Sequence, residues 1–301
     1  MILIAGGTGR LGSDLVKRLA GRGHEVRILT RDPARAERLA GGRITVMRGD
    51  VRDRQSLQPA LLGVETIVSA VHGFNDSAGD SLTAIDRDGN ANLIDAAKAA
   101  GAAFVLLSTV GAAADSPMEL FAAKYVAEQH ALRSGLPCTI VRATAFLQVW
   151  IELLEQTAAR SGRPLVFARG QNPINFVSVG DVAALVERVV LDSAARGETL
   201  EIGGPENLTF DQLAHLVQNA AGRTAAPKHV PPPMLRLIAN TVGRVKPELG
   251  RQVRAALAMD QMNLAFDAAP IRRRYPELPC TSPAEVLAGH RQPELEIATR
   301  G

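Results

Sequence analysis

Cysteines and membrane-length apolar runs are both lacking in this sequence. Only two of its 301 residues are cysteines, Cys138 and Cys280, and they lie far apart without the spacing of a metal site. We therefore predict no metal centre, and we interpret Cys138 as a buried small hydrophobic residue. No apolar stretch reaches the length of a membrane-spanning helix, and the first predicted strand starts at Ile2, which leaves no room for a targeting segment. These absences predict a cytoplasmic protein with no membrane partner.

Charge of one sign is also lacking. The formal net charge is +3, and the 34 basic and 31 acidic side chains are dispersed along the chain. Nucleic-acid-binding proteins concentrate basic residues on one face, so we predict no nucleic-acid partner. Hydrophobic residues make up 46% of the chain, which is enough for one large domain or two unequal ones.

The first half of the sequence alternates short apolar runs with amphipathic segments, which is typical of a parallel sheet covered by helices on both faces. We predict strands at Ile2–Ala5, Glu25–Thr30, Ile44–Arg48, Thr66–Ala70, Phe104–Ser108 and Thr139–Arg142. We predict helices at Leu11–Ala20, Pro33–Leu39, Arg54–Leu62, Ala84–Ala100 and Met118–Ser134. Right-handed crossovers of this kind make a doubly wound α/β sheet.

The first strand runs directly into a glycine-rich turn, Gly-Gly-Thr-Gly-Arg-Leu-Gly over residues 6–12. Gly6 permits the tight turn, Gly9 lets the backbone approach a pyrophosphate, and Gly12 lets the next helix pack closely. The free N–H groups of that helix would face the phosphates. Because the turn joins a strand to an amphipathic helix, it predicts a Rossmann dinucleotide site. The expected cofactor contacts here are Gly6, Thr8, Gly9, Arg10, Leu11 and Gly12.

After Arg142 the regular alternation is lost. We predict a helix over Phe146–Ala158, strands over Pro173–Val177 and Leu200–Ile202, and a helix capped by Thr209. The predicted organisation is a dinucleotide-binding core over residues 1–145, followed by a smaller α+β substrate lid over 146–290 that is interleaved with the core. Residues 291–301 form a predicted polar tail.

The end of the second predicted strand bears on the choice between NAD and NADP. An NAD site normally places Asp or Glu there to bind the ribose hydroxyls, but this chain has Thr30 and Arg31, with no carboxylate before Asp32. A guanidinium suits the extra phosphate of NADP, and Arg35 follows one turn later. The alternative is a pair of solvated loop arginines. We favour NADP(H) over NAD(H), with Arg31 as the phosphate ligand.

Further cofactor contacts are expected where the next strands end. Asp50 follows the third strand and would face the adenine amino group, while Val51 would pack on the ring. Asp53 is interpreted as a helix cap. Ala70 and Val71 follow the fourth strand and would lie beside the phosphate turn.

Candidate substrate contacts follow the fourth and fifth strands. His72 directly follows Val71 and would point into the cleft, although a surface or structural histidine is the alternative. Ser108 and Thr109 end the fifth strand, and Ser108 would either contact the ligand or hydrogen-bond local backbone.

The loop after the sixth strand should pass near the nicotinamide. Thr144 would reach its carboxamide, and Phe146 with Trp150 would wall an aromatic substrate pocket. An aromatic pair at this spacing is equally interpreted as core.

Taken together, these residues resemble those of the NmrA-like NAD(P)-binding group of atypical short-chain dehydrogenase/reductases. The likeness covers residues 1–222 and rests on the turn over 6–12, Thr30-Arg31, Gly49-Asp50, Ser108-Thr109, Lys124 and the stretch Gly135–Arg142. It implies a Rossmann fold, a nicotinamide cofactor, a small-molecule substrate and a monomer or homodimer. The group includes quinone reductases, isoflavone-type reductases, redox sensors and inactive scaffolds, so the likeness leaves the substrate open.

One residue typical of the wider superfamily is missing. A Tyr-x-x-x-Lys pair normally lies on the helix after the fifth strand, where the tyrosine donates a proton and the lysine holds the nicotinamide ribose. Lys124 is present, but Leu120 occupies the tyrosine position. Tyr125 points about 100° away around the helix, and Tyr275 lies far along the chain. The resemblance implies that Lys124 keeps the ribose and acts as a general acid; the alternative is a solvated lysine paired with Glu128.

Because the usual proton donor is absent, we expect a reaction that needs little acid assistance. Hydride transfer to a quinone, an enone or another small carbonyl compound fits, since the developing oxyanion is delocalised. The alternative is a non-catalytic NADP(H)-binding redox sensor that changes its affinity for a protein partner. A nucleotide-sugar epimerase is disfavoured, because such relatives retain the tyrosine.

Overall fold

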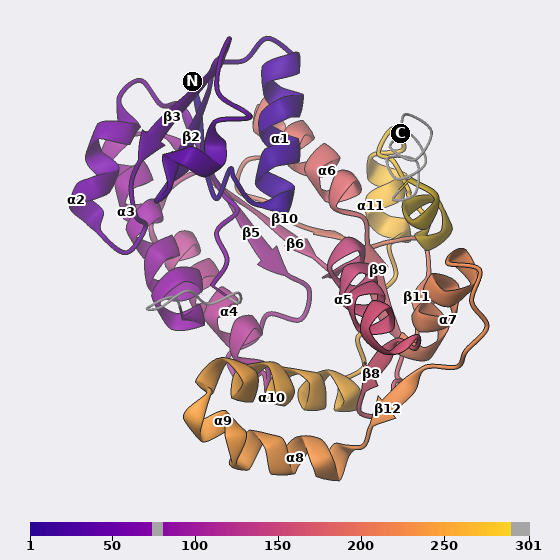
Figure 1. Cartoon of the computed structure of the whole chain (residues 1–301). Helices are drawn as coiled ribbons and strands as arrows, with labels where there is room; N and C mark the ends of the chain where they lie inside the picture. The colour runs from indigo at the N-terminus through magenta and orange to yellow at the C-terminus, as the bar shows by residue number, and fades with distance from the viewer. Residues whose placement is uncertain (74–80, 290–301) are drawn as a thin grey trace. The chain divides into compact units, whose positions relative to one another are not determined.

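The structure is a computed structural model that describes residues 1–73 and 81–289 (Figure 1). The chain divides into two compact units. Unit 1 comprises Met1–Ala143 and Gly180–Ile202, and unit 2 comprises Thr144–Val179 and the chain from Gly203 onward. The predicted polar tail over 291–301 lies outside the described residues.

Unit 1 is built on a seven-stranded parallel sheet with the order β10-β6-β5-β4-β1-β2-β3. The order runs outward from β1 in both directions, so the doubly wound α/β topology predicted from the sequence is confirmed. The predicted strand at Leu200–Ile202 joins this sheet next to β6, with Leu200 opposite Val141. The strands are β1 (Ile2–Ala5), β2 (Val26–Thr30), β3 (Ile44–Arg48), β4 (Thr66–Ser69), β5 (Ala103–Thr109), β6 (Cys138–Ala143) and β10 (Thr199–Ile202).

Helices cover both faces of this sheet (Figure 1). On one face, α3 (Asn90–Ala100) and α4 (Glu119–Arg133) share a core cluster with Leu3, Ile67 and Leu106 of the central strands. On the other face lie α1 (Arg10–Gly21) and α6 (Val179–Leu191), followed by the short turn η4 (Ser193–Ala195). All residues of β1 and β4 are buried, as expected for parallel strands covered on both sides.

Two predicted helices are shorter and tighter than expected. The predicted helix over Pro33–Leu39 is the 3-10 turn η1 (Pro33–Ala36). The predicted helix over Arg54–Leu62 consists of α2 (Arg54–Leu57) and the 3-10 turn η2 (Gln58–Leu61), which has a proline in its first turn. Asp53 caps α2 by accepting a hydrogen bond from the Gln55 backbone over 3.0 Å, which confirms its predicted role.

The predicted helix over Ala84–Ala100 begins as a π-helix, η3 (Leu82–Gly89), and continues as α3. The wide turn buries Leu82, Ile85 and Asp86. Gly89 ends it where a Cβ would lie 2.6 Å from the side chain of Val51. π-Helical turns are rare and occur frequently at functional sites. This segment is therefore a candidate part of a functional site.

Unit 2 consists mainly of helices, and its strands are short. Its three-stranded sheet has the order β11-β9-β7, and β8 pairs with β12 in a separate ribbon. Its strands are β7 (Ala145–Phe146), β8 (Leu165–Phe167), β9 (Ile174–Val177), β11 (Asn207–Leu208) and β12 (Lys228–Val230). Its helices are α5 (Leu147–Ser161), α7 (Phe210–Ala220), α8 (Pro232–Asn240), α9 (Val242–Val245), α10 (Pro247–Gln261) and α11 (Ala269–Arg274). The predicted Thr209 cap is confirmed, since Thr209 and Gln212 form a capping box at α7.

The described residues lack two features. None of their helices combines the length and the apolar character needed to cross a membrane. They also contain no group of three or more His, Cys, Asp or Glu residues arranged to hold a metal ion.

Candidate functional site

The turn between β1 and α1 is too crowded for side chains at two of its glycines. Gly6 has φ +83°, and a Cβ there would lie 2.6 Å from the backbone oxygen of Ala70. A Cβ on Gly12 would lie 2.2 Å from the Gly6 oxygen, so α1 packs directly against the turn. At Gly9 a Cβ would lie 3.2 Å from the Gly6 oxygen, which is a tight contact, so a side chain there would require the turn to shift slightly. This cradle has the form that a pyrophosphate requires.

The N-terminus of α1 continues the cradle. Gly9 is its N-cap, and within the described chain no side chain caps the helix and no acidic residue lies in its first turn. The first backbone N–H groups and the positive end of the helix dipole therefore suit an anion. Leu11 is buried beneath the turn, so only its backbone can reach a ligand, while Arg10 is exposed.

Arg31 lies exposed just beyond β2, and its positive charge acts on Asp50, which follows β3. Partial burial tends to raise the pKa of Asp50, but hydrogen bonds and charge from Arg52, with a contribution from the charge of Arg31, lower it below its ordinary value. Asp50 binds Arg52 through both carboxylate oxygens. Val51 is buried in the core. The adenine contacts assigned to Asp50 and Val51 stay predictions.

Lys124 is held in a buried ion pair. Its side chain is 8% exposed, and its Nζ lies 2.9 Å from Oδ1 of Asp86 and donates to the Val71 oxygen over 3.3 Å. Asp86 is fully buried on η3, and its Oδ2 accepts a hydrogen bond from Gly73 N over 2.8 Å. Burial acts to raise the pKa of Asp86, but the charge of Lys124 and the hydrogen bond and charge of His72 lower it to about 2. Asp86 is therefore ionised at neutral pH.

Asp86 belongs to a polar network at the end of β4. Asn90 donates from Nδ2 to the Asp86 backbone oxygen over 2.7 Å, and Ser69 donates to Asn90 Oδ1 over 2.5 Å. His72 Nδ1 lies 3.4 Å from Asp86 Oδ1, and the His72 side chain is 44% exposed. His72 is thus the solvent-exposed member of a network whose other members are buried.

The alternative pairing of Lys124 with Glu128 is wrong. Glu128 is buried and accepts hydrogen bonds from Arg142 Nε over 2.9 Å and Nη2 over 2.6 Å. Ser108 also donates to Glu128, so its hydroxyl proton goes to a side chain and not to local backbone. Cys138 is buried as predicted, and its burial together with the charge of Glu128 raises its pKa to about 12. Glu128 therefore binds Arg142 and Ser108, and Lys124 pairs with Asp86 instead.

The candidates that fall in unit 2 are occupied by contacts within that unit. Thr144 donates to Asn175 Oδ1 over 2.9 Å. The ring of Trp150 meets that of Phe210 edge-on with centroids 4.8 Å apart, and Phe210 in turn contacts Phe176 at 5.7 Å. This aromatic cluster agrees with the core interpretation of Trp150. The roles of Thr144, Phe146 and Trp150 toward a ligand stay predictions.

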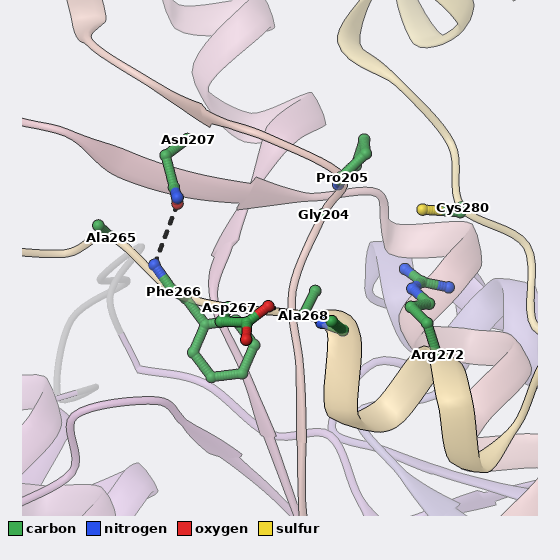
Figure 2. Close-up of a pocket in the computed structure, with 10 residues that line it drawn as sticks. Gly204, Pro205, Asn207, Ala265, Phe266, Asp267, Ala268, Arg272 and Cys280 are labelled. Carbon is green, nitrogen blue, oxygen red and sulfur yellow. Dashed lines mark hydrogen bonds between the residues drawn. The ribbon is translucent and has the colours of Figure 1, made fainter.

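Unit 2 also contains a hollow of about 590 Å³, shown in Figure 2. Asn207 fixes one wall by accepting a hydrogen bond from Phe266 N over 3.0 Å, and Arg272 fixes another by donating to the Gly203 oxygen over 3.0 Å. Its ten lining residues include none that the sequence predicted for the site: Gly204, Pro205, Asn207, Ala265, Phe266, Asp267, Ala268, Ala269, Arg272 and Cys280.

Sequence reasoning missed Asp86 and Asn90. Both lie within the segment predicted as an ordinary helix over Ala84–Ala100, four residues apart and therefore on the same face of that helix. A carboxylate on the buried side of a helix needs a cation, so this position was a usable signal. The partner Lys124 could not be assigned from sequence, because the pairing depends on how α4 lies against η3.

The strand order and the glycine cradle define a Rossmann-like α/β protein whose polar groups gather at the carboxyl ends of the strands. The NmrA-like family matches residues 1–268, and the chain belongs to that family. The resemblance inferred from the motifs is thereby confirmed.

Individual relatives cover most of the chain. The NAD(P)H azoreductase of Xenophilus azovorans is 28% identical over 272 residues, which is 90% of this chain and 87% of that protein. A photosystem II assembly factor of Synechocystis is 31% identical over 243 residues, or 79% and 72% of the two proteins. The structure of an Escherichia coli NADPH-dependent quinone oxidoreductase in complex with NADPH matches with a TM-score of 0.79 at 24% identity, and covers 96% of this chain and 99% of that one. This last likeness supports the fold.

Proposed function

We propose that this protein is an NADPH-dependent reductase that transfers a hydride to a quinone or a comparable electron-poor acceptor. The proposal is supported by relatives named as an NAD(P)H azoreductase and a quinone oxidoreductase. It is supported equally by the chain's own residues, which offer a phosphate cradle at one end of the site and a buried cation at the other.

The described residues fit NADPH. The cradle at Gly6, Gly9 and Gly12 and the N-terminus of α1 would hold the pyrophosphate. Arg31, exposed beyond β2, would bind the phosphate on the adenosine ribose. An ammonium group has three donors. Two of those on Lys124 meet Asp86 and the Val71 oxygen, and we assign the third to the nicotinamide ribose.

The proposed substrate class follows from the absence of the superfamily's proton-donating tyrosine. Reduction requires a hydride, which bound NADPH would supply, and one proton for the acceptor oxygen. Leu120 stands where the superfamily has its proton-donating tyrosine. An electron-poor quinone, whose reduced oxyanion is a weak base, makes the least demand on an acid.

The observation that carries the proposal is the buried Lys124–Asp86 pair. Burying a lysine and a carboxylate together costs desolvation free energy that a merely structural contact rarely recovers. The pair lies at the end of β4, in the half of the fold that takes the nicotinamide in doubly wound dinucleotide-binding proteins. A functional role for Lys124 explains why the pair is kept.

The test is to follow NADPH absorbance with the purified protein against a panel of quinones, enones and azo compounds. We expect turnover that is faster with NADPH than with NADH and fastest with the quinones. Lys124→Met should abolish turnover, while Lys17→Met, a change of an exposed lysine on α1, should leave it unchanged. Absence of turnover with every acceptor would contradict the proposal.

Two observations favour a second function. The relative at 31% identity is named as an assembly factor, and Leu120 removes the usual proton donor. An NADP(H)-binding regulator would bind NADPH in the micromolar range without turnover. Binding without NADPH oxidation in the same panel would therefore favour this alternative.

A further inference from the structure

We propose that His72 supplies the proton that the missing tyrosine would have donated, and that Asp86 is the positioning residue that orients its ring. The inference rests on the proposed reductase function and deepens it, because it replaces Lys124 by His72 as the proton donor. The observation behind it is that one carboxylate contacts both the buried lysine and the exposed histidine.

The geometry orients the imidazole. Nδ1 of His72 faces Oδ1 of Asp86 at 3.4 Å, and the carboxylate is fixed from its other side by Gly73 N at 2.8 Å. A carboxylate that accepts the Nδ1 proton selects the tautomer and leaves Nε2 directed away from it. The His72 side chain is 44% exposed, so we place Nε2 on the side that a substrate can reach.

Lys124 is less suited to donate. Its side chain is 8% exposed, and its Nζ already contacts Asp86 and the Val71 oxygen. Giving up a proton would leave the buried Asp86 carboxylate without its cation, which is costly in the protein interior. A proton from His72 leaves the Lys124–Asp86 pair intact.

The position of His72 along the sheet fits the role. Ala70 and Val71 run against the phosphate turn, since a Cβ on Gly6 would lie 2.6 Å from the Ala70 oxygen and 3.1 Å from Val71 N. His72 is the next residue. It lies at the end of β4, on the β5–β6 side of β1, which is the nicotinamide half of a doubly wound dinucleotide site.

Bound NADPH would supply the acceptor with a hydride, which carries both electrons, and would leave as NADP⁺. The imidazolium of His72 gives the Nε2 proton to the acceptor oxygen; an O–H bond forms, the N–H bond breaks, and His72 becomes a neutral imidazole whose Nδ1–H remains on Asp86. Water then returns one proton to Nε2. The charged groups that face His72 include Asp86 on η3 and, bound to it, Lys124 on α4.

The kinetic test uses His72→Asn, because asparagine keeps an N–H that can reach Asp86 but has nothing at the Nε2 position. The loss should grow with the basicity of the acceptor oxygen. We expect kcat to fall by about 100-fold or more with an unactivated enone, but by less than about 10-fold with an electron-poor quinone. Any fall of wild-type kcat at alkaline pH should disappear in the variant, because asparagine carries no proton to transfer. His215→Asn, on the exposed side of α7, is the matched control and should behave as the wild type.

A second measurement does not depend on activity. The ¹⁵N chemical shifts of neutral His72 in the resting protein should report the Nδ1–H tautomer, whereas an exposed histidine such as His215 prefers Nε2–H. Asp86→Asn should return His72 to the Nε2–H tautomer, with its folding checked by circular dichroism. An Nε2–H tautomer in the wild type would overturn the orienting role of Asp86.

The outcomes separate the two proposals. Unchanged kcat in His72→Asn with every acceptor would overturn this inference alone. No turnover by the wild type with any acceptor would overturn the proposed function and this inference with it. A graded loss in His72→Asn together with the Nδ1–H tautomer would support both.

Discussion

Unit 1 and unit 2 differ in strand length and in how completely they enclose their ion pairs. Unit 1 builds its sheet from strands of four to seven residues and holds ion pairs beside it, among them the buried pair of Lys124 with Asp86. Unit 2 has strands of two to four residues and packs aromatic rings around Phe210. Unit 2 also holds the buried carboxylate of Asp260, but its partner Arg169 has a side chain that is 60% exposed. The regular unit therefore encloses both members of an ion pair, whereas the Arg169–Asp260 pair of unit 2 is open to solvent on one side.

This difference has a physical reason. A buried charge needs partners that cannot move away, and long parallel strands with helices on both faces provide them. Asp86 is fixed from three elements: η3 carries it, α4 supplies Lys124, and the chain after β4 supplies Gly73. The Arg169–Asp260 pair of unit 2 lies where the arginine remains in contact with solvent. We infer that the phosphate contacts of the cofactor lie in unit 1, and that a change in the aromatic cluster around Phe210 alters stability without altering cofactor affinity.

The largest effect is expected at the glycine cradle. Gly12→Ala would place a Cβ 2.2 Å from a backbone oxygen that cannot rotate away. We expect a loss of about 3 kcal/mol in the free energy of unfolding and at least about a 10-fold rise in the Kd for NADPH. Urea unfolding and fluorescence titration measure the two.

Gly21→Ala on the same helix is the control for this change. A Cβ at Gly21 would meet no atom within 4 Å, and alanine is the better helix former, so stability should rise by up to about 1 kcal/mol. Equal effects of the two substitutions would show that the cradle is not tightly packed.

A substitution in unit 2 should separate stability from binding. Trp150→Ala removes the edge contact with Phe210, and we expect a loss of about 2 kcal/mol in stability with the Kd for NADPH within about twofold of the wild type. Trp150→Phe keeps a ring and should cost less than half as much. A large rise in Kd for Trp150→Ala would break the division of roles between the units.

Acid should weaken unit 1 through Asp86. Its pKa is about 2 in the folded chain against an ordinary value of 3.8. Its contribution is therefore complete above about pH 5 and is lost as the pH falls through 4 toward 2. We expect a loss of about 2 kcal/mol from this group over that range. In Asp86→Asn this group no longer titrates, so urea unfolding at pH 4, 3 and 2.5 should show the gap between the two proteins narrowing. A constant gap would mean that Asp86 does not titrate with folding.

The smallest effect concerns cofactor choice. Arg31→Asp should raise the Kd for NADPH by about 10-fold, or about 1.4 kcal/mol, because an exposed guanidinium contributes one charge-assisted contact to a phosphate. The Kd for NADH, which lacks that phosphate, should change little. Equal losses for both nucleotides would assign Arg31 to another role.

The strands and the glycine turn of unit 1 could be predicted from the sequence because the residue patterns that specify them are local. Continuous apolar runs, glycine stops and the turn over residues 6–12 identified the strands of the sheet and the cradle, and Asp53 was recognised as a cap. The sequence could not predict the π-helical start at Leu82–Gly89 or the choice of Asp86 as partner of Lys124. Both depend on packing between elements that are distant in sequence. The same holds for unit 2, where Trp150 meets Phe210 sixty residues later.

The most direct test of the account is a calorimetric titration of the wild-type protein with NADPH, with NADH as the comparison. The account predicts saturable heat with one nucleotide per chain, tighter binding of NADPH than of NADH, and a higher melting temperature in excess nucleotide. No heat and no melting shift with either nucleotide would contradict it.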